Sequence, residues 1–509
     1  MQISPTAFDW IIPLCLEQEA FCGRLWAPAG AQPPVRLLHY VQLMAGSHTV
    51  TDTIAAISTP PGRGGIGIVR LSGPQAASIA VQLVSLRQPL EHARARLADV
   101  LDQDCGEGAG IDAGRIDEAL VTFFAAPNSY TAEDLVEIAA HGSPVVLELL
   151  LRRALGLGAR LAEPGEFTQR AFLAGRLDLT QAEAVRDLIE AQTLTQARQA
   201  ASQMGGALSR RVQPVKQALV ELIALLEAGI DFAEDDVDVA PAVEIARRIG
   251  ELTPPLSALE ASFARGRIVH DGLTLAIVGR PNAGKSSLFN RLVERDRAIV
   301  TATPGTTRDT VTERISLEGI PLELVDTAGL REAAGEVEQL GIARSREALA
   351  DAALVVVVLD ATEPLNDEER RLLAAVEGRP AVVAVNKSDL VGKMAAAGRP
   401  QPDCAGLPAL PTSALTGEGI PALRERILAL ATGGAAAEPG MLTSLRHQQA
   451  VASALAALAD AAQANAASIP HEMILMDLYR ALWALDSLTG QTTPDDILSL
   501  IFSTFCIGK

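Results

Sequence analysis

A glycine-rich loop between an apolar run and a helix-forming segment is the feature that most constrains this chain. Residues 279–286 read G-x-x-x-x-G-K-S and directly follow the apolar residues 273–278. In that order, backbone N–H groups and a helix N-terminus can converge on phosphate oxygens. The two glycines permit the tight turn, Lys285 supplies a fixed positive charge and the Ser286 hydroxyl can ligate Mg²⁺. We therefore expect the chain to bind a nucleoside triphosphate.

Three further motifs identify the expected base as guanine. Each follows a short apolar stretch, and they are Asp326-Thr327-Ala328-Gly329, Asn386-Lys387-Ser388-Asp389 and Ser413-Ala414-Leu415. The Asp389 carboxylate can accept hydrogen bonds from both the ring N–H and the exocyclic amine of guanine, a pair of donors that adenine lacks. A surface turn is the better interpretation of N-K-S-D when it stands alone. Four motifs in the correct order instead predict a GTP-binding domain.

The residues expected to support hydrolysis depart from the ordinary pattern. Thr307, in the switch-like segment 301–309, could complete the Mg²⁺ shell. Leu330 stands where signalling GTPases carry a glutamine that positions water, so hydrolysis must recruit another group. The amide oxygen of Asn282 could help to hold a monovalent cation beside the phosphates. Glu338 is a candidate to orient water, and a solvated switch carboxylate is at least as good an interpretation of it.

Composition limits the remaining possibilities. The chain has 509 residues, enough for roughly three domains, and a formal net charge of −19. That charge opposes general nucleic-acid binding, so any RNA contact must be local or belong partly to a partner. The five cysteines lack metal-ligand spacing, no apolar run approaches the ~20 residues of a membrane span, and no signal peptide is visible. We expect a soluble cytosolic protein.

Helical sequence flanks the GTP-binding module on both sides. Apolar residues recur at helical spacing in 179–203, 212–232, 242–265 and 445–467, which is interpreted as the core of a bundle. The module therefore looks inserted into a helical bundle. Ahead of the bundle, residues 51–165 mix alternating strand patterns with helix, which predicts a separate α+β domain. The expected fold is multidomain, with an α+β domain, an α-helical bundle and an inserted, doubly wound α/β P-loop domain.

Longer stretches of sequence resemble one family. These are TPPGRGGIGIVRLSG (59–73), PNSYTAEDLVEIAAHG (127–142), EPGEFTQRAFLAGRLDLTQAEAV (163–185) and the terminal FCIGK (505–509). Together with the G motifs, they resemble the bacterial MnmE (TrmE) family of tRNA-modification GTPases from about Thr51 to Lys509. The implied domains are an extension over 1–50, a TrmE-type folate-binding domain over 51–168, a helical domain over 169–270 and 434–509, and a G domain over 271–433.

The resemblance also implies an activity and partners. The family is a cytoplasmic, homodimeric, potassium-activated GTPase whose G domains dimerise across the nucleotide. With an FAD-containing partner of the MnmG (GidA) type, it adds an aminomethyl or carboxymethylaminomethyl group to C5 of wobble uridine 34 of tRNA. A 5-formyltetrahydrofolate, or a related reduced folate, is its implied one-carbon source. GTP, Mg²⁺ and K⁺ are therefore the other expected ligands, with tRNA as substrate and no membrane contact.

Matching positions carry the implied site residues. Glu338 and Lys285 match catalytic positions, Ser286 and Thr307 match Mg²⁺ ligands, and Asn282, Thr301, Thr303 and Thr306 match the potassium site. The GTP-binding positions are Asn282, Ala283, Gly284, Lys285, Ser286, Ser287, Thr301, Ala302, Thr303, Pro304, Gly305, Thr306, Thr307, Asp326, Thr327, Ala328, Gly329, Asn386, Lys387, Ser388, Asp389, Ser413, Ala414 and Leu415.

The folate positions match Arg70, Glu137, Arg176 and Lys509, and Cys506 matches a thiol near the active site. Arg176 stands where the family usually has lysine, and Ala132 where it usually has glycine. The two arginines are plausible partners for folate carboxylates, although ordinary surface ion pairs are an alternative interpretation.

Two other functions and one segment stay open at this level. A ribosome-assembly GTPase and a purely regulatory switch share the G motifs, but the N-terminal motifs and FCIGK argue against both.

Residues 1–50 fit neither a secretory signal nor a transit peptide. We expect Met44 to be the true initiator, with residues 1–43 an upstream translation artefact or at most a disordered tail.

Overall fold

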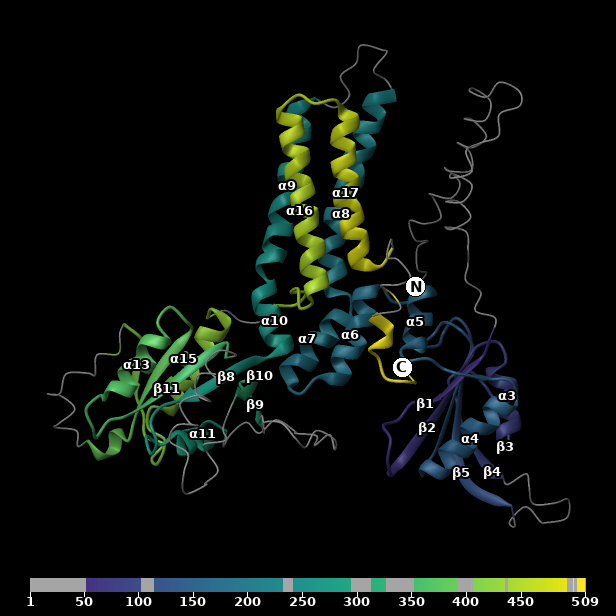
Figure 1. The fold of residues 1–509 in the computed structure, drawn as a ribbon. Coiled ribbons are helices and arrows are strands. Elements are labelled where there is room, and N and C mark those ends of the chain that lie inside the picture. The colour runs from purple at the N-terminus through teal and green to yellow at the C-terminus, as the bar shows by residue number, and fades with distance from the viewer. Residues whose placement is uncertain are drawn as a thin grey trace.

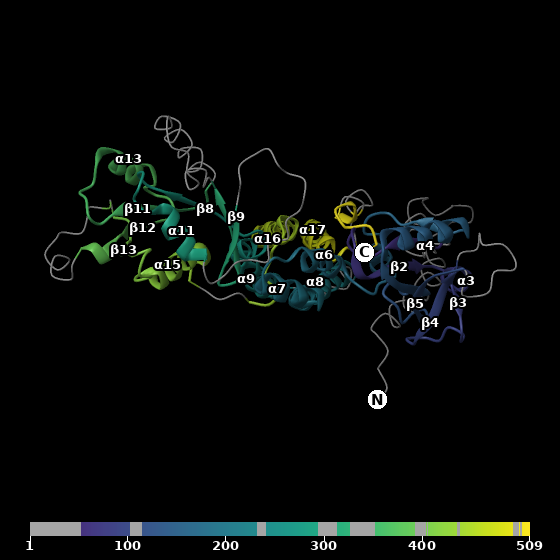
Figure 2. The ribbon, with the colours of Figure 1, turned by 90° about the horizontal axis from the view of Figure 1, so that it is seen from below.

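The computed structural model describes residues 52–101, 114–231, 241–293, 313–325, 352–391, 404, 406–434, 438–491, 498 and 501–508. They form three parts, and a helical domain lies between an N-terminal α+β domain and an α/β domain (Figure 1). The view from below shows the same order (Figure 2).

The N-terminal domain is built on a seven-stranded sheet with the strand order β3-β4-β5-β6-β2-β1-β7. Neighbouring strands are antiparallel except for β1 and β7. The strands are β1 (Ile54–Ile57), β2 (Gly64–Ser72), β3 (Ser85–Leu86), β4 (Ala95–Leu101), β5 (Arg115–Phe124), β6 (Leu135–Gly142) and β7 (Arg160–Leu161). Helices α3 (Ala76–Leu83) and α4 (Pro144–Gly156) pack on one face, where alternate strand residues such as Val69, Val121 and Ile138 are fully buried.

The C-terminal segment 501–508 returns to this domain. Ile507 forms an isolated bridge with Pro164, just before α5 (Glu166–Leu173). Gly508 lies so close to β1 that a Cβ there would be 2.7 Å from the carbonyl oxygen of Ile57. Phe502 and Phe505 are buried in one cluster with Leu179. Residues 501–508 therefore contact the N-terminal domain at Pro164 and β1, and the helical segment that begins at Leu179.

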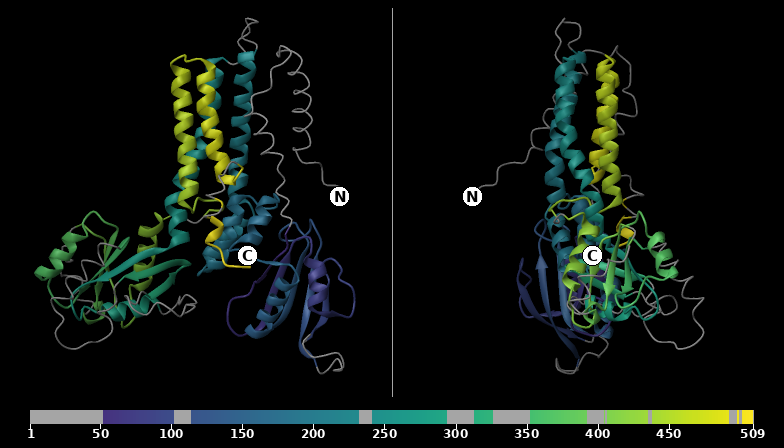
Figure 3. Two further views of the ribbon diagram at one scale, coloured as in Figure 1. Left: turned by 45° about the vertical axis from the view of Figure 1, so that its right-hand side comes forward. Right: turned by 90° about the vertical axis from the view of Figure 1, so that its left-hand side faces the viewer.

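Four long helices form the bundle, namely α8 (Ala207–Asp231), α9 (Ala242–Ala261), α16 (Leu445–Ala466) and α17 (His471–Thr489). Helices α8 and α17, α17 and α16, α16 and α9, and α9 and α8 are neighbours. Leu219, Leu222 and Leu226, spaced three and four residues apart, are fully buried in this core, as their periodicity predicts. Figure 3 shows the bundle from two further sides.

Shorter helices stand at the base of the bundle: α6 (Leu179–Glu190), α7 (Leu194–Met204) and α10 (Phe263–Asp271). The helical sequence 179–203 is two helices because Thr193 starts a new one. Its hydroxyl accepts from the Gln196 backbone N–H while the Gln196 side chain bonds back to Thr193, a reciprocal cap that favours a helix start at this point.

The α/β domain contains a six-stranded sheet with the order β13-β12-β11-β8-β10-β9. Only β9 and β10 pair antiparallel. The strands are β8 (Leu273–Val278), β9 (Glu313–Leu317), β10 (Ile320–Val325), β11 (Leu354–Asp360), β12 (Ala381–Asn386) and β13 (Ala409–Pro411). Helices α11 (Lys285–Val293) and α15 (Ile420–Thr432) share a core with one face, and α13 (Asp367–Ala375) packs on the other. The predicted doubly wound arrangement is confirmed.

The chain leaves the helical domain through α10 and returns to it at α16, so the α/β domain is inserted as predicted. This confirms the expected fold class of three parts. The boundaries placed at residues 168, 270 and 433 stay predictions. In the part of the chain that the structure describes, none of the helices combines the length and the apolar character that crossing a bilayer requires.

Candidate nucleotide and folate sites

The phosphate loop connects β8 to α11 through backbone conformations that favour glycine. Gly279 has φ of 151°, and a Cβ there would lie 2.3 Å from the carbonyl oxygen of Val358. Gly284 has φ of 93°, and its Cβ would lie 2.2 Å from Nδ2 of Asn386. Neither position therefore tolerates a side chain without movement of its neighbours.

Lys285 begins α11 and is held against this loop. Its Nζ donates to the carbonyl oxygens of Gly279 at 2.7 Å and Arg280 at 2.8 Å. Burial lowers the pKa of Lys285 from its ordinary value, and the charge of Glu368 opposes that shift. Ser286 and Ser287 follow in the first turn of the same helix, so the loop residues predicted to contact phosphates and Mg²⁺ are brought together.

Asn386 connects the phosphate loop with the loop predicted to close over the base. Its Nδ2 donates to the carbonyl oxygen of Ala283 at 2.9 Å, and its Oδ1 accepts from the backbone N–H of Ala414 at 3.0 Å. The residue is only 2% exposed. Sequence analysis assigned Asn386 to the nucleotide, and the structure adds this bridge between two loops.

Arg291 of α11 supports the base loop from the other side. Its Nε donates to the carbonyl oxygen of Ala414 at 3.0 Å, and its Nη2 donates to that of Leu415 at 2.7 Å. Ser413 is fully buried, and its N–H donates to the carbonyl oxygen of Glu418 at 2.9 Å. Asp389 lies nearby on the short helix η3 (Ser388–Leu390), whose first N–H donates to the carbonyl oxygen of Thr412 at 3.1 Å. The two motifs predicted to recognise the base are thus adjacent.

Asp360 is a site residue that sequence analysis missed. It accepts from Lys387 Nζ at 2.7 Å and lies 3.5 Å from Nη2 of Arg280. Burial by itself would raise the pKa of Asp360, but hydrogen bonds from Lys387 and Thr362 outweigh it and hold the pKa below the ordinary value. Its position could have indicated this role, because Asp360 ends the apolar strand β11. The acidic residues of the predicted motifs likewise follow apolar strands.

Several predicted positions lie outside the residues that the structure describes. They are Thr301 to Thr307, Asp326 to Gly329, Leu330 and Glu338 in the α/β domain, and Lys509 at the chain end. Their roles stay predictions.

A pocket of about 630 Å³ opens in the N-terminal domain. Glu137 and Arg176, both predicted folate ligands, line it. Arg70 joins them indirectly, because its Nη2 and Nε donate to Oε1 of Glu137 at 2.7 and 3.0 Å. Its Nη1 also donates to the carbonyl oxygen of Gly508 at 3.3 Å, so the C-terminal segment reaches this site.

Tyr130, another lining residue, lies beside both arginines. The guanidinium carbon of Arg70 is 5.7 Å from the centre of its ring, and that of Arg176 is 5.4 Å away. Arg176 Nη1 donates to the Tyr130 carbonyl oxygen at 2.5 Å, and the Tyr130 hydroxyl hydrogen bonds with Thr168 at 2.9 Å. Sequence analysis did not single out Tyr130. Cation–π contacts of this kind fix the positions of the two positive charges.

The structure also describes Ala132 and Cys506, two residues near this site that the sequence singled out. Ala132 adopts φ of 61°, in the left-handed region where glycine is preferred, so alanine fits there only at a cost in backbone strain. Cys506 is a free, exposed thiol, and its carbonyl oxygen accepts from the N–H of Gly165 at 3.4 Å. The predicted thiol therefore lies on the segment that contacts this domain.

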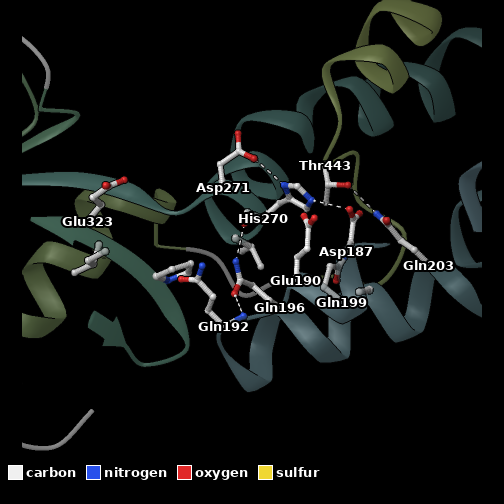
Figure 4. A pocket seen from close by; sticks show the side chains of 14 residues that line it. Asp187, Glu190, Gln192, Gln196, Gln199, Gln203, His270, Asp271, Glu323 and Thr443 are labelled. Carbon is white, nitrogen blue, oxygen red and sulfur yellow. Dashed lines mark hydrogen bonds and ion pairs between the residues drawn. The ribbon is translucent and has the colours of Figure 1, made fainter. Parts of the chain in front are cut away.

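Another pocket, of about 180 Å³, lies where α7, α10 and β10 meet (Figure 4). It contains none of the predicted ligand residues. His270 stands at its edge, with Nε2 3.2 Å from Asp187 Oδ1 and Nδ1 2.7 Å from Asp271 Oδ1. The hydrogen bond with Asp187 raises the pKa of His270 to about 9, against the effect of burial and with support from Asp271.

Further bonds at this junction join α7 to the α/β domain and to α10. Thr193 Oγ1 donates to the carbonyl oxygen of Gly319 at 2.6 Å, and Gln196 Nε2 donates to that of His270 at 2.7 Å. A Cβ at Gly319 would lie 2.0 Å from Thr195 Oγ1, so the turn between β9 and β10 fits closely against α7. The helical domain and the α/β domain are therefore joined at this junction by a hydrogen bond and by close packing.

Comparisons with known proteins agree along the chain. Family models for the GTP-binding protein TrmE N-terminus and for the MnmE helical domain match residues 53–176 and 179–506. A tRNA modification GTPase MnmE from Koribacter versatilis is 58% identical over 463 residues, which cover 90% of this chain and 99% of that protein. The MnmE of Chloroflexus aurantiacus is 42% identical, with 90% and 100% covered. Among solved structures, the G domain of the T. maritima FeoB iron transporter matches 31% of this chain and 98% of that chain at 26% identity, with a TM-score of 0.22.

Proposed function

The chain belongs to the MnmE family of tRNA modification GTPases, and from this premise we propose that it hydrolyses GTP to drive the modification of tRNA. The observation that carries the proposal is 58% identity to an MnmE over 90% of the chain, which includes all three parts of the fold. The local arrangement of Lys285, Asn386 and Asp389 supports a guanine nucleotide as the ligand.

Within the nucleotide site, we assign each residue a separate task. Lys285 and the loop N–H groups bind phosphate oxygens. The Asp389 carboxylate selects guanine by accepting hydrogen bonds from the ring N–H and the exocyclic amine of the base. The Ser286 hydroxyl fits Mg²⁺, which prefers oxygen ligands, and Thr307 would complete its shell. Asn282 has φ of 63°, a conformation that asparagine tolerates better than most residues, and its amide oxygen would hold K⁺ with Thr301, Thr303 and Thr306. Faster GTP turnover in K⁺ than in Na⁺ at equal ionic strength would support that assignment.

The N-terminal pocket is proposed to bind 5-formyltetrahydrofolate or a related reduced folate. Its lining suits such a ligand, because Tyr130, Phe124, Pro127 and Leu135 offer apolar surface beside the charged Glu137 and Arg176. Arg70, Arg176 and Lys509 would bind the carboxylates and polar edge of the ligand, which would supply the one-carbon unit. Arg70 is held by Glu137, and this arrangement keeps its guanidinium in place before the ligand arrives.

The product is proposed to be an aminomethyl or carboxymethylaminomethyl group at C5 of wobble uridine 34. This chain would act in the cytoplasm with an FAD-containing partner of the MnmG type, and tRNA would be the shared substrate. Glu338 is assigned to orient the attacking water, since Leu330 cannot do so.

An exposed part of the N-terminal sheet supports a homodimer, because the face away from α3 and α4 is covered by Phe167 of α5 at β1 but is exposed at β4 and β5. Leu97 and Leu120 are cross-strand neighbours on the face away from α3 and α4, and they are 41% and 49% exposed. Adjacent exposed leucines on an open sheet favour a protein contact. Replacing both with aspartate should convert the dimer to a monomer in light scattering, and an unchanged mass would argue against this face.

Nucleoside analysis of tRNA tests the proposal as a whole. Bacterial cells that lack this protein should lose the modified wobble uridine, and expression of the full chain should restore it. A chain with Lys285→Ala should fail to restore it although it is produced at the same level. Normal wobble uridine in the cells without the protein would favour the alternative of a ribosome-assembly GTPase.

A further inference from the structure

A groove between α8 and α9 is lined by four arginines although the chain is strongly acidic. Arg210 and Arg211 lie near the start of α8, and Arg247 and Arg248 lie near the start of α9. The two helices run in opposite directions, so the two pairs stand toward opposite ends of the groove (Figure 1). The groove has a volume of about 700 Å³, and Glu221 and Glu251 are its only carboxylates among the described lining residues. It is separate from both predicted ligand pockets.

Arg210 and Arg211 are held by neutral groups. Arg210 donates to the carbonyl oxygen of Gly205, and Arg211 Nη1 donates to that of Gly440 at 3.1 Å. Within the part of the chain that the structure describes, neither forms a salt bridge. A carbonyl fixes a guanidinium without neutralising it, so two oriented positive charges remain available for an anion.

The opposite end of the groove is only partly neutralised. Arg247 pairs with Glu244 at 2.7 Å and Glu251 at 2.5 Å, and Arg248 shares Glu244 at 2.7 Å. All three ion pairs are exposed enough for solvent to screen them, so a polyanion can compete for these guanidinium groups. The positive charges of the four arginines exceed the negative charges of Glu221, Glu244 and Glu251. The groove is therefore net positive, although the chain has a net charge of −19.

The walls and floor of the groove also suit RNA. Pro214 of α8 and Pro255 of α9 line it, and each removes the helical N–H partner of the carbonyl four residues earlier, at Arg210 and Glu251. Free carbonyl oxygens can accept hydrogen bonds from ribose 2′-hydroxyl groups. Val215, Leu252 and Leu256 provide an apolar floor. Arginine, with its planar fork of donors, is the side chain best suited to phosphate.

We propose that the groove between α8 and α9 binds the phosphate backbone of the substrate tRNA, an assignment that rests on the proposed function in tRNA modification. An acidic chain needs a local cationic surface to hold RNA. The pocket of Figure 4 has no arginine, the predicted folate pocket has one, and the pocket lined by Arg186 and Arg267 also contains Glu183, Asp187 and Asp271, which offset their charge. The groove thus supplies a local positive surface for RNA, which the net negative charge of the chain would otherwise repel.

Fluorescence anisotropy of labelled tRNA with the full chain tests this site. Arg210→Gln with Arg211→Gln should raise the Kd about tenfold near 0.1 M salt and reduce the slope of log K against log salt by about 2. The matched control is Arg152→Gln with Arg480→Gln, which removes the same charge from the exposed faces of α4 and α17. The control should change the Kd less than twofold, and GTP turnover should stay unchanged in both variants.

Three outcomes would overturn the proposal: no binding of tRNA by the wild-type chain, unchanged Kd in the groove variant, or an equal loss in the control variant. A groove variant that binds tRNA normally but loses the MnmG-type partner would reassign the groove to protein. Failure of the proposed function is separate, because it would appear as normal wobble uridine in cells that lack the chain, whatever the anisotropy shows.

Discussion

Asn386 Nδ2 donates a 2.9 Å hydrogen bond to the carbonyl oxygen of Ala283, which joins the end of β12 to the phosphate loop 103 residues earlier. The same side chain accepts from Ala414, so one amide holds together the loops that would bind phosphate and base. This relationship makes the two halves of the nucleotide site interdependent.

Asn386→Ala should therefore weaken the binding of both GTP and GDP. The substitution leaves the buried carbonyl of Ala283 and the partly buried N–H of Ala414 without partners, at a cost of about 1–3 kcal/mol, or roughly fivefold or more in affinity. Titration with a fluorescent guanine nucleotide measures the effect. Asn465→Ala is the control, because Asn465 is also buried and donates to a carbonyl, that of Ala242 in the bundle. That variant should lose stability and keep its nucleotide affinity.

Asp389→Asn should reduce discrimination between guanine and other bases. An amide has to place its N–H₂ group against one of the two guanine donors from which the carboxylate accepts. Competition of GTP against ATP and xanthosine triphosphate should show GTP affinity lowered by about tenfold or more, since charge-assisted bonds of about 1.5–3 kcal/mol are lost. Unaltered selectivity would remove Asp389 from the base site.

Glu338→Ala should slow hydrolysis without a comparable loss of binding. A residue that acts only in the transition state lowers the rate of a single turnover while the Kd for GTP stays nearly constant. Rapid mixing of excess protein with GTP gives that rate, and Glu338→Gln should be slowed as well if charge is needed. A parallel loss of affinity would point to a structural role instead.

Tyr130→Leu should weaken binding of a reduced folate, whereas Tyr130→Phe should largely preserve it. Leucine removes the ring that lies beside Arg70 and Arg176, and contacts of this type contribute roughly 0.5–2 kcal/mol. Phenylalanine keeps the ring and loses only the bond with Thr168. Calorimetry with 5-formyltetrahydrofolate should separate the variants about threefold or more. Equal affinities would show that the ring has no part in placing the charges.

His270 should make stability depend on pH. Its pKa is raised to about 9 in the folded protein from an ordinary 6.5, so its pairing with Asp187 contributes fully below pH 6.5 and is lost as pH rises through 9. Thermal unfolding between pH 6 and 9.5 should show a decline that His270→Gln flattens. An identical pH dependence in the variant would exclude this residue as its source.

Sequence patterns predicted the loops and helices whose conformation depends on local spacing. The phosphate loop, N-K-S-D and the helical periodicity of Leu219 to Leu226 all lie within short segments whose conformation the residues themselves favour. Arg291 with Leu415, and Arg70 with Gly508, are 124 and 438 residues apart, and only the folded chain brings them together. Asp360 stayed hidden because an acid at the end of one strand has no motif around it. Ala132 could be recognised from the sequence as a departure from the usual glycine, but its strained, left-handed backbone conformation is visible only in the structure.

The packing of residues 501–508 against β1 and α5 has a consequence for biosynthesis. Arg70 emerges from the ribosome early, yet its contact with Gly508 cannot form until 438 further residues have been made. The N-terminal domain can fold around its own sheet in the meantime, but the pocket beside Glu137 remains without one of its contacts. A nascent chain that stalls within the helical domain would therefore lack the contact of Arg70 with Gly508, and the pocket predicted to bind folate would be left without one of the groups that position its arginine.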